Sequence, residues 1–187
     1  MGAVGRLFVG VDLAAEARHA LAARLAGTVE GRLPGKVVPP PNWHLTLRFL
    51  GDVDQVGRDR LLMALAGADL GSAFDMTLTG LGAFPRPAKA AVLWAGVADG
   101  SVALGAVASR VEEACREAGF GPEERPFHPH LTLSRIRPPE DLTGLIRDVQ
   151  EFRIRTMVDE VTLFESHLGR GGARYEALER FELDPST

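Results

Sequence analysis

Hydrophobic and polar positions alternate in two short stretches that carry the same four residues. His-Leu-Thr-Leu stands at residues 44–47 and again at 130–133, 86 positions later in a chain of 187 residues. Side chains of a β-strand point alternately to its two faces, so each stretch predicts a strand with His and Thr on one face and leucines on the other. A shuffled chain of this composition would contain about 0.2 His-x-Thr sequences. The pair therefore predicts a duplicated unit whose polar faces line one cleft.

Apolar residues at helical spacing predict helices, and apolar runs bounded by Pro or Gly predict strands. Helices are expected near residues 14–29, 54–66 and 101–118, and a short one after Pro138-Pro139; strands are expected near 6–13, 44–50, 74–81, 90–97, 130–137, 152–157, 160–166 and 175–183. The first helix has Ala17, Leu21, Leu25 and Val29 on one stripe. Residues 84–87 are expected to join two strands, and residues 184–187 to form a frayed tail.

The order of these elements predicts an α+β fold. Local β-α-β order is mixed with hairpins near the end of the chain, which favours two antiparallel-rich sheets related by a pseudo-two-fold axis. We expect a single domain, residues 1–187, with lobes of approximately 1–90 and 91–187. The terminal strands can be exchanged between such lobes.

Composition narrows the class of protein. The net charge of −4 argues against a broad non-specific nucleic-acid binder, because such binding depends on many phosphate contacts. The single cysteine, Cys115, excludes an internal disulfide and a thiolate metal cluster, and its helical spacing with Val107 and Val111 predicts a buried core position. No signal pattern or long apolar run is found, so we expect a cytoplasmic protein without a membrane span.

The residues of the two motifs suit proton transfer and phosphate binding. An unperturbed imidazole has a pKa of about 6.5, so one His can take a proton while the other gives one. Thr46 and Thr132 share the faces of His44 and His130 and can donate hydrogen bonds to phosphoryl oxygens.

Polar residues that follow each motif extend the candidate site. If the strands stay regular, Arg48 shares the face of His44, and Ser134 shares the face of His130. Arg135 stands at the strand end, where its guanidinium can bind a phosphate. The aromatic rings of Phe49 and Tyr175 can stack on a base, although core packing is the favoured interpretation of each.

Other interpretations of the same residues stay open. His128-Pro129-His130 offers two imidazoles to a metal, but no third ligand is apparent, and we expect no metal site. The glycine-rich tract 169–172, next to His167, lacks the lysine of a phosphate-binding loop and predicts a hairpin turn. The paired motifs also fit a non-catalytic module that binds RNA ends, or a duplicated domain that is only structural.

The sequence resembles the 2H phosphoesterases, in particular the bacterial and archaeal LigT-like RNA 2′,3′-cyclic phosphodiesterases, once called 2′-5′ RNA ligases. The first motif with its flanks, residues 42–51, and the second, residues 127–135, are both similar to the family pattern. The similarity extends to residues 163–166 and 175–176 near the end of the chain.

The resemblance implies a bilobal fold with a central cleft and helices outside. It implies metal-free hydrolysis of a 2′,3′-cyclic phosphate to a 2′-phosphate, without a cofactor. By the same resemblance His44 is the proton donor, His130 is the proton acceptor, and Thr46 and Thr132 hold the phosphoryl oxygens. RNA ends or cyclic nucleotides are then the substrates, and 2′-5′ RNA ligation or cleavage is an alternative activity. We expect a monomer.

Overall fold

The computed structural model describes residues 5–27, 33–149, 151–170 and 172–185. The helices are α1 (Ala15–Ala26), α2 (Gln55–Gly67), α3 (Ser101–Glu117) and α4 (Thr143–Asp148), with a 3₁₀ turn at Pro40–Asn42. The strands are β1 (Gly5–Asp12), β2 (Lys36–Val37), β3 (His44–Val53), β4 (Phe74–Arg86), β5 (Lys89–Val97), β6 (His130–Glu140), β7 (Arg153–Val158), β8 (Glu160–Gly169) and β9 (Gly172–Glu182).

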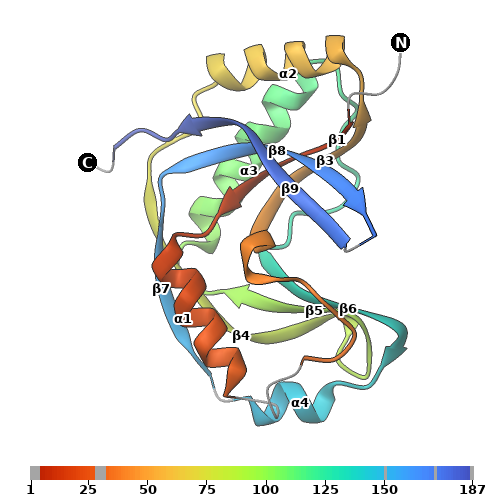
Figure 1. Ribbon diagram of the computed structural model, residues 1–187. Coiled ribbons are helices and arrows are strands. Elements are labelled where there is room, and N and C mark those ends of the chain that lie inside the picture. The colour runs from red at the N-terminus through yellow and green to blue at the C-terminus, as the bar shows by residue number, and fades with distance from the viewer. Residues whose placement is uncertain (1–4, 28–32, 150, 171, 186–187) are drawn as a thin grey trace.

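The strands of the described chain form one curled antiparallel sheet. Its order is β7-β4-β5-β6-β3-β1-β8-β9, and β2 pairs with β6. One residue pair, Leu45 with Leu131, joins β3 to β6 and divides the sheet into an upper and a lower half in Figure 1. The predicted α+β duplicated fold is therefore confirmed, with its two expected sheets continuous through this pair.

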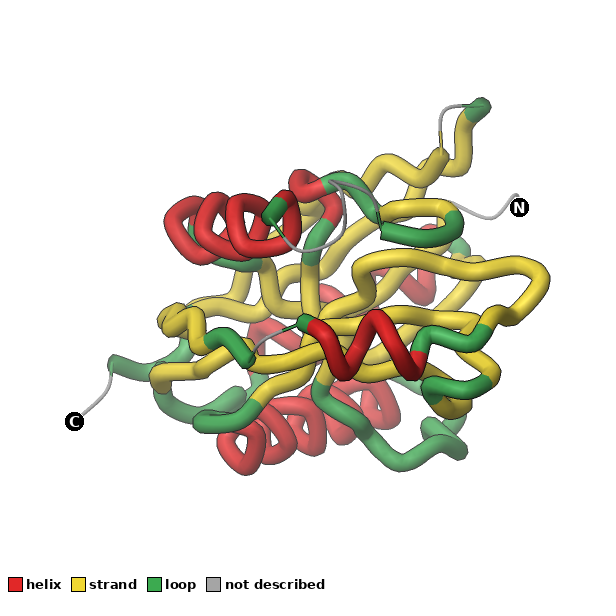
Figure 2. The backbone as a smooth tube through the Cα atoms, turned by 90° about the horizontal axis from the view of Figure 1, so that it is seen from below, coloured by secondary structure: helices red, strands yellow, loops and turns green. Residues whose placement is uncertain are grey.

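The helices cover the outer side of each half. Helix α1 follows β1 in the chain but packs against β7 of the other half, and α3 follows β5 but packs against β3. Each of these helices therefore crosses to the opposite half. Figure 2 shows helices on both sides of the strands.

The leucines of both motifs hold the motif strands in place. Leu45, Leu131 and Leu133 have no exposed surface, and Leu47 is 8% exposed. They pack in one large core cluster that also contains Cys115, so its predicted core position is confirmed. Burying each leucine contributes about 1.5–3 kcal/mol. The apolar faces thus fix the strands, and the faces with His and Thr remain available to solvent.

Several element ends differ from the prediction. Strand β4 continues to Arg86, so most of the expected connection at 84–87 is strand. Strand β6 continues through the two prolines to Glu140, because Pro is tolerated where a strand has an irregular or free edge. Asp184 is not frayed: its N–H donates to the carbonyl of Gly71 over 2.9 Å. Val29 and residues 186–187 lie outside the described residues.

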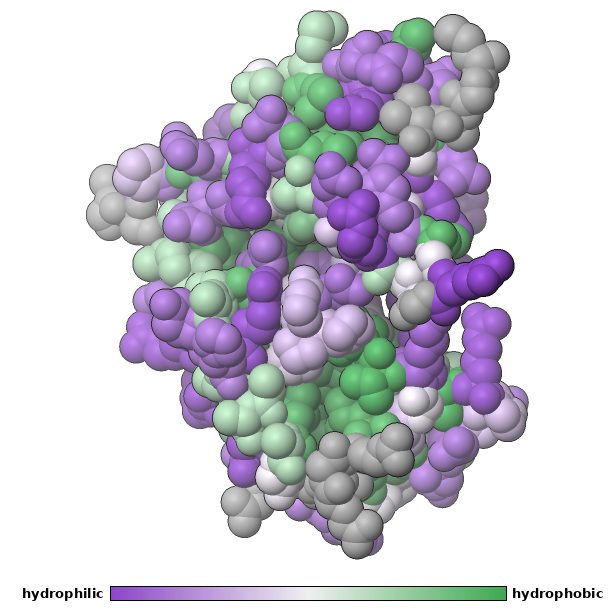
Figure 3. Space-filling model, viewed as in Figure 1, coloured by the Kyte–Doolittle hydropathy of each residue, from purple (hydrophilic) through white to green (hydrophobic). Residues whose placement is uncertain are grey.

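The face of the molecule seen in Figure 3 is mostly hydrophilic, with hydrophobic areas in its middle and lower parts. None of the helices in the described ranges is long and apolar enough to cross a membrane.

Candidate active site

The two motifs meet where the halves of the sheet join. Leu45 and Leu131 are direct partners in antiparallel strands. Extending this register places His44 opposite Thr132, and Thr46 opposite His130. These four side chains share one face because they flank the leucines on the other face. The duplication therefore brings both His-Thr pairs to a single place, which the two-fold arrangement makes nearly symmetric.

A β-bulge follows the Thr in each motif. The pairing of β3 with β1 skips Leu47, and the pairing of β6 with β5 skips Leu133, the residue 86 positions later. An extra residue in a strand shifts the alternation of every side chain after it. The residues beyond each bulge therefore point to faces opposite to those predicted from a regular strand.

The bulges contradict two of the candidate residues. Arg48 turns away from His44 and is buried at 9% exposure, where it pairs with Glu112 and Glu123. Ser134 has no exposed surface. The prediction that Arg48 and Ser134 share the faces of the histidines is therefore wrong. The cleft-facing positions after the bulges belong instead to Phe49 and Arg135, which are again 86 positions apart.

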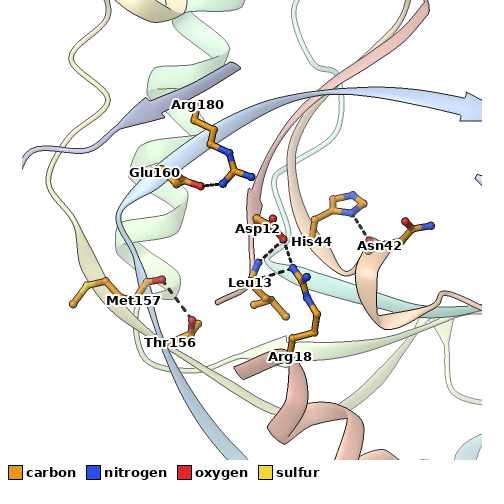
Figure 4. Close-up of polar contacts among 9 residues, drawn as sticks. All are labelled: Asp12, Leu13, Arg18, Asn42, His44, Thr156, Met157, Glu160 and Arg180. Carbon is orange, nitrogen blue, oxygen red and sulfur yellow. Dashed lines mark hydrogen bonds and ion pairs between the residues drawn. The ribbon is translucent and has the colours of Figure 1, made fainter. Parts of the chain in front are cut away.

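Both histidines are held in the same way. The Nδ1 atom of His44 lies 2.8 Å from the carbonyl oxygen of Asn42, and that of His130 lies 2.7 Å from the carbonyl oxygen of His128. A carbonyl oxygen only accepts, so in each ring Nδ1 carries the hydrogen and donates it. Each neutral imidazole is thereby left with its lone pair on Nε2. Figure 4 shows the contact of His44 with Asn42.

The two Nε2 atoms have different surroundings. His44 Nε2 lies 3.0 Å from Thr46 Oγ1, while His130 Nε2 has no hydrogen-bond partner within the described ranges. Thr46 can donate to the neutral ring of His44 or accept from the protonated ring. His130 is therefore the ring whose Nε2 is directly available to a molecule in the cleft.

A cleft connects the two rings. A cavity of about 1070 Å³ is lined by His130, and a smaller one of about 120 Å³ is lined by His44. The residues that line both cavities are Thr46, Phe49, Thr132 and Arg135. The hydroxyls and the guanidinium thus lie between the imidazoles, where a phosphoryl group could contact all of them.

Burial and charge lower the pKa of both rings. Desolvation is the largest cause of the lowered pKa of His44, and Arg135 and His130 lower it further. Desolvation also lowers the pKa of His130, together with the nearby charges of His128 and Arg135. Both imidazoles are therefore mostly neutral at pH 7 in the free protein. The effect of His130 on the pKa of His44 also indicates that the two rings lie close together.

Asp12 makes the two rings unequal. Its carboxylate, on the strand residue paired with His44, raises the pKa of that ring against the larger effect of burial. In the described structure no carboxylate acts on His130 in this way. Asp12 accepts from the N–H of Leu13 over 2.9 Å and pairs with Arg18, which fixes its position (Figure 4). Asp12 was not among the predicted site residues, although an acidic residue directly after a buried strand indicates one.

Aromatic rings surround both histidines. Phe8 and Tyr175 contact His44 with centroid distances of 4.6 and 5.0 Å, and Phe84 contacts His130 at 5.0 Å. Phe49 is 45% exposed and lines the cleft, so its favoured interpretation as a core residue is wrong. Tyr175 is half-buried and lines the smaller cavity. These rings limit how each imidazole can turn.

Two other histidines named in the sequence analysis take different positions relative to the paired rings. His128 lies next to His130, with ring centroids 6.3 Å apart, and lines the larger cavity. His167 contacts Glu176 in the hairpin of β8 and β9. In the described part of the chain, no group of three or more His, Cys, Asp or Glu side chains is placed to hold a metal ion.

The fold and the paired His-Thr strands define a duplicated α+β phosphoesterase. The model of the family LigT like Phosphoesterase matches residues 11–94 and 97–175, so the chain belongs to this family.

Named relatives agree with this assignment. The RNA 2′,3′-cyclic phosphodiesterase of Aeropyrum pernix is 36% identical over 150 residues, which cover 78% of this chain and 85% of the relative. The Escherichia coli protein of the same name is 32% identical over 185 residues, which cover 95% of this chain and 96% of the relative. The crystal structure of E. coli LigT complexed with 3′-AMP matches with a TM-score of 0.76 and 30% identity, and the match covers 96% of this chain and 98% of that one. The structure of TT0787 of Thermus thermophilus has a TM-score of 0.76, 29% identity, and coverage of 97% and 100%.

Proposed function

We propose that this enzyme hydrolyses the 2′,3′-cyclic phosphate at the end of an RNA, or of a nucleoside, to a 2′-phosphate. The observation that carries the proposal is the pair of imidazoles whose Nδ1 atoms are held by backbone carbonyls while Thr46, Thr132 and Arg135 lie between them. The names of the A. pernix and E. coli relatives support the same activity for this chain.

The reaction needs one proton acceptor and one proton donor. His130 takes a proton from water through Nε2, and the water oxygen forms a bond to phosphorus. The bond between phosphorus and O3′ breaks, and protonated His44 gives its Nε2 proton to O3′. The product is a 2′-phosphate with a free 3′-hydroxyl. His44 ends neutral and His130 ends protonated, and exchange with solvent restores both rings.

The charges around the rings support this division of roles. The carboxylate of Asp12 favours the protonated form of His44, whereas His128 and Arg135 disfavour protonation of His130. Thr46, Thr132 and Arg135 are fixed donors to the oxygens on which charge develops, and such donors stabilise a phosphoryl transition state. The proposed chemistry uses only side chains of this chain, without metal or cofactor.

Incubation with adenosine 2′,3′-cyclic phosphate in EDTA tests this proposal. We expect 2′-AMP at the same rate with and without EDTA, because the acid, the base and the phosphate donors are all side chains. Chromatography separates 2′-AMP from 3′-AMP. Formation of 3′-AMP, or loss of activity in EDTA, would contradict the proposal. Tight binding without any product would favour a non-catalytic RNA-end-binding module.

The lowered pKa values of both histidines predict the pH dependence of kcat/KM. The active free enzyme has one protonated ring and one neutral ring, so the rate falls above both pKa values and below both. Because both lie below the usual 6.5, we expect a bell-shaped profile centred below pH 6.5 that declines through neutral pH.

Binding of an anionic phosphate between the rings should raise both pKa values, so the profile of kcat should lie at higher pH than that of kcat/KM. Rates measured from pH 4.5 to 9 at constant ionic strength check both expectations. A kcat/KM that keeps rising with pH above 7 would show that neither ring acts as the acid.

A further inference from the structure

A lysine lies next to the site, on a strand that contributes no residue to the proposed reaction. Lys36 of β2 is the direct partner of Arg135 in β6. Partners across antiparallel strands share a face, so Lys36 lies on the cleft-facing side of the sheet with Arg135. Val38, two residues along the same strand direction, lines the cavity of His44. Lys36 therefore lies just outside that cavity, next to Val38 and Arg135, which line it.

The side chain of Lys36 reaches across to the other half of the sheet. Its Nζ lies 3.9 Å from the place that a Cβ atom on Gly172 would occupy, at the start of β9. Gly35, directly before β2, allows the chain to approach β6 closely: its φ is +74°, and a Cβ there would lie 2.5 Å from the carbonyl oxygen of Arg135. The backbone of β2 is thus held tightly against β6, and the ammonium group of Lys36 lies beside the start of β9.

Two cations lie side by side here without a counter-charge. Within the described ranges, neither Lys36 nor Arg135 forms an ion pair or hydrogen bond with a carboxylate, whereas Arg18, Arg48 and Arg174 do. Like charges directly opposite each other on paired strands are destabilising. The fold therefore keeps an uncompensated pair of positive charges at this edge of the cleft, which an anion would relieve.

The larger cavity is lined by charges of both signs between residues 112 and 125. Glu112 and Glu123 are ion-paired with Arg48, and Glu124 stands next to Arg125. An RNA strand that leaves the cleft past Arg135 and Lys36 meets two positive charges, which attract its phosphates.

We propose that Lys36, together with Arg135, binds the phosphate that joins the terminal nucleotide of the RNA to its 5′ neighbour. The inference rests on the proposed function and adds a second phosphate contact to it, which favours oligonucleotides with a cyclic phosphate end over cyclic mononucleotides. Arg135 faces both the cavity between the rings and Lys36, so it contributes to both phosphates.

The test compares two substrates, adenosine 2′,3′-cyclic phosphate and the dinucleotide ApA with the same cyclic end. We expect wild type to have the higher kcat/KM on the dinucleotide, and Lys36→Ala to lower the ratio of the two values about tenfold, mainly through KM, in line with one lost charge-assisted contact. The slope of log(kcat/KM) against log[salt] for the dinucleotide should become shallower by about 0.7.

The chain offers a matched control, because its only lysines are Lys36 and Lys89. Lys89 is exposed at the start of β5 and Lys89→Ala should leave the substrate ratio of wild type unchanged. A third substrate, the cyclic mononucleotide with a 5′-phosphate, shows whether one isolated phosphate is enough. If it matches the dinucleotide, the subsite recognises the phosphate alone, and if it does not, the linked nucleoside also contributes.

The outcomes separate the two proposals. Wild type that hydrolyses neither the mononucleotide nor the dinucleotide contradicts the proposed function. Wild type that hydrolyses it, with an equal substrate ratio in Lys36→Ala and wild type, overturns the second phosphate site alone. Acylation of the amines, read by mass spectrometry, is independent of turnover: a dinucleotide with a 2′-phosphate end should protect Lys36 and leave Lys89 reactive, and equal reactivity of both would also overturn the site.

Discussion

Replacing His130 with alanine is expected to lower kcat by about 10²–10⁴-fold, because the variant loses the proton acceptor of the reaction. His44→Ala is expected to have a loss in the same range, since the donor to O3′ is then absent. The two losses should not add in the double variant, because a reaction that has lost one partner of a concerted pair gains little from the other. Steady-state kinetics on adenosine 2′,3′-cyclic phosphate measures all three.

Folding provides the necessary control for these variants. Both rings are only partly buried and face the cleft, so we expect the melting temperature of each variant to stay within a few degrees of wild type. His19→Ala, an exposed position on α1, should match wild type in both rate and stability. Retention of full activity in both single variants would falsify the paired-histidine mechanism, whatever the product of the wild-type enzyme.

Sequence alone was sufficient to predict the parts of the site that depend on short-range alternation. His44, Thr46, His130 and Thr132 share a face with each other because each motif is a regular strand up to its second leucine. The identical leucines also predicted that the motif strands would be anchored in a core. The α+β class followed from the order of the predicted elements, and the duplication followed from the motifs that recur 86 residues apart.

The positions beyond the motifs could not be predicted from alternation, because a bulge depends on the partner strand. In β3, a regular pattern places Phe49 in the core and Arg48 in the cleft, which agrees with ordinary hydrophobicity. The structure reverses both, since Glu112 and Glu123 provide partners for a buried guanidinium. Comparison of the two motifs offers a signal: Arg135 occupies the position equivalent to Phe49, and Ser134 the one equivalent to Arg48.

The reversed arginine leads to the second large prediction. Arg48 Nη1 lies 2.7 Å from Glu123 Oε2, and its Nε lies 3.0 Å from Glu112 Oε2, an ion pair without the alignment of a hydrogen bond. Nη2 donates to the carbonyl of Gly121, and the N–H of Glu123 donates to Glu112 over 2.9 Å. One guanidinium therefore connects β3, α3 and residues 121–126, the segment that forms a wall of the larger cavity and leads to the second motif.

Arg48→Ala is expected to destabilise the protein by about 2 kcal/mol, less than for a fully buried ion pair because Glu112 and Glu123 are partly exposed and can be rehydrated. This corresponds to a fall of roughly 4–8 °C in melting temperature for a chain of this length. We also expect a lower kcat/KM, since the two carboxylates then repel each other beside the wall of the cleft. The melting temperature of Arg48→Lys should lie between those of Arg48→Ala and wild type. An ammonium group keeps the positive charge but cannot contact the oxygens of Glu112, Glu123 and Gly121 in the same geometry.

Arg110 gives the matched comparison, because it lies on the same helix as Glu112 and forms an exposed ion pair with Asp69. Removing one partner of an exposed pair costs less than about 1 kcal/mol, so Arg110→Ala should melt close to wild type. Equal stability of Arg48→Ala and Arg110→Ala would mean that the buried network does not stabilise the fold. A stable Arg48→Ala with a strongly reduced kcat would instead place the effect of Arg48 in the orientation of residues 121–126 and of the His130 strand that follows them.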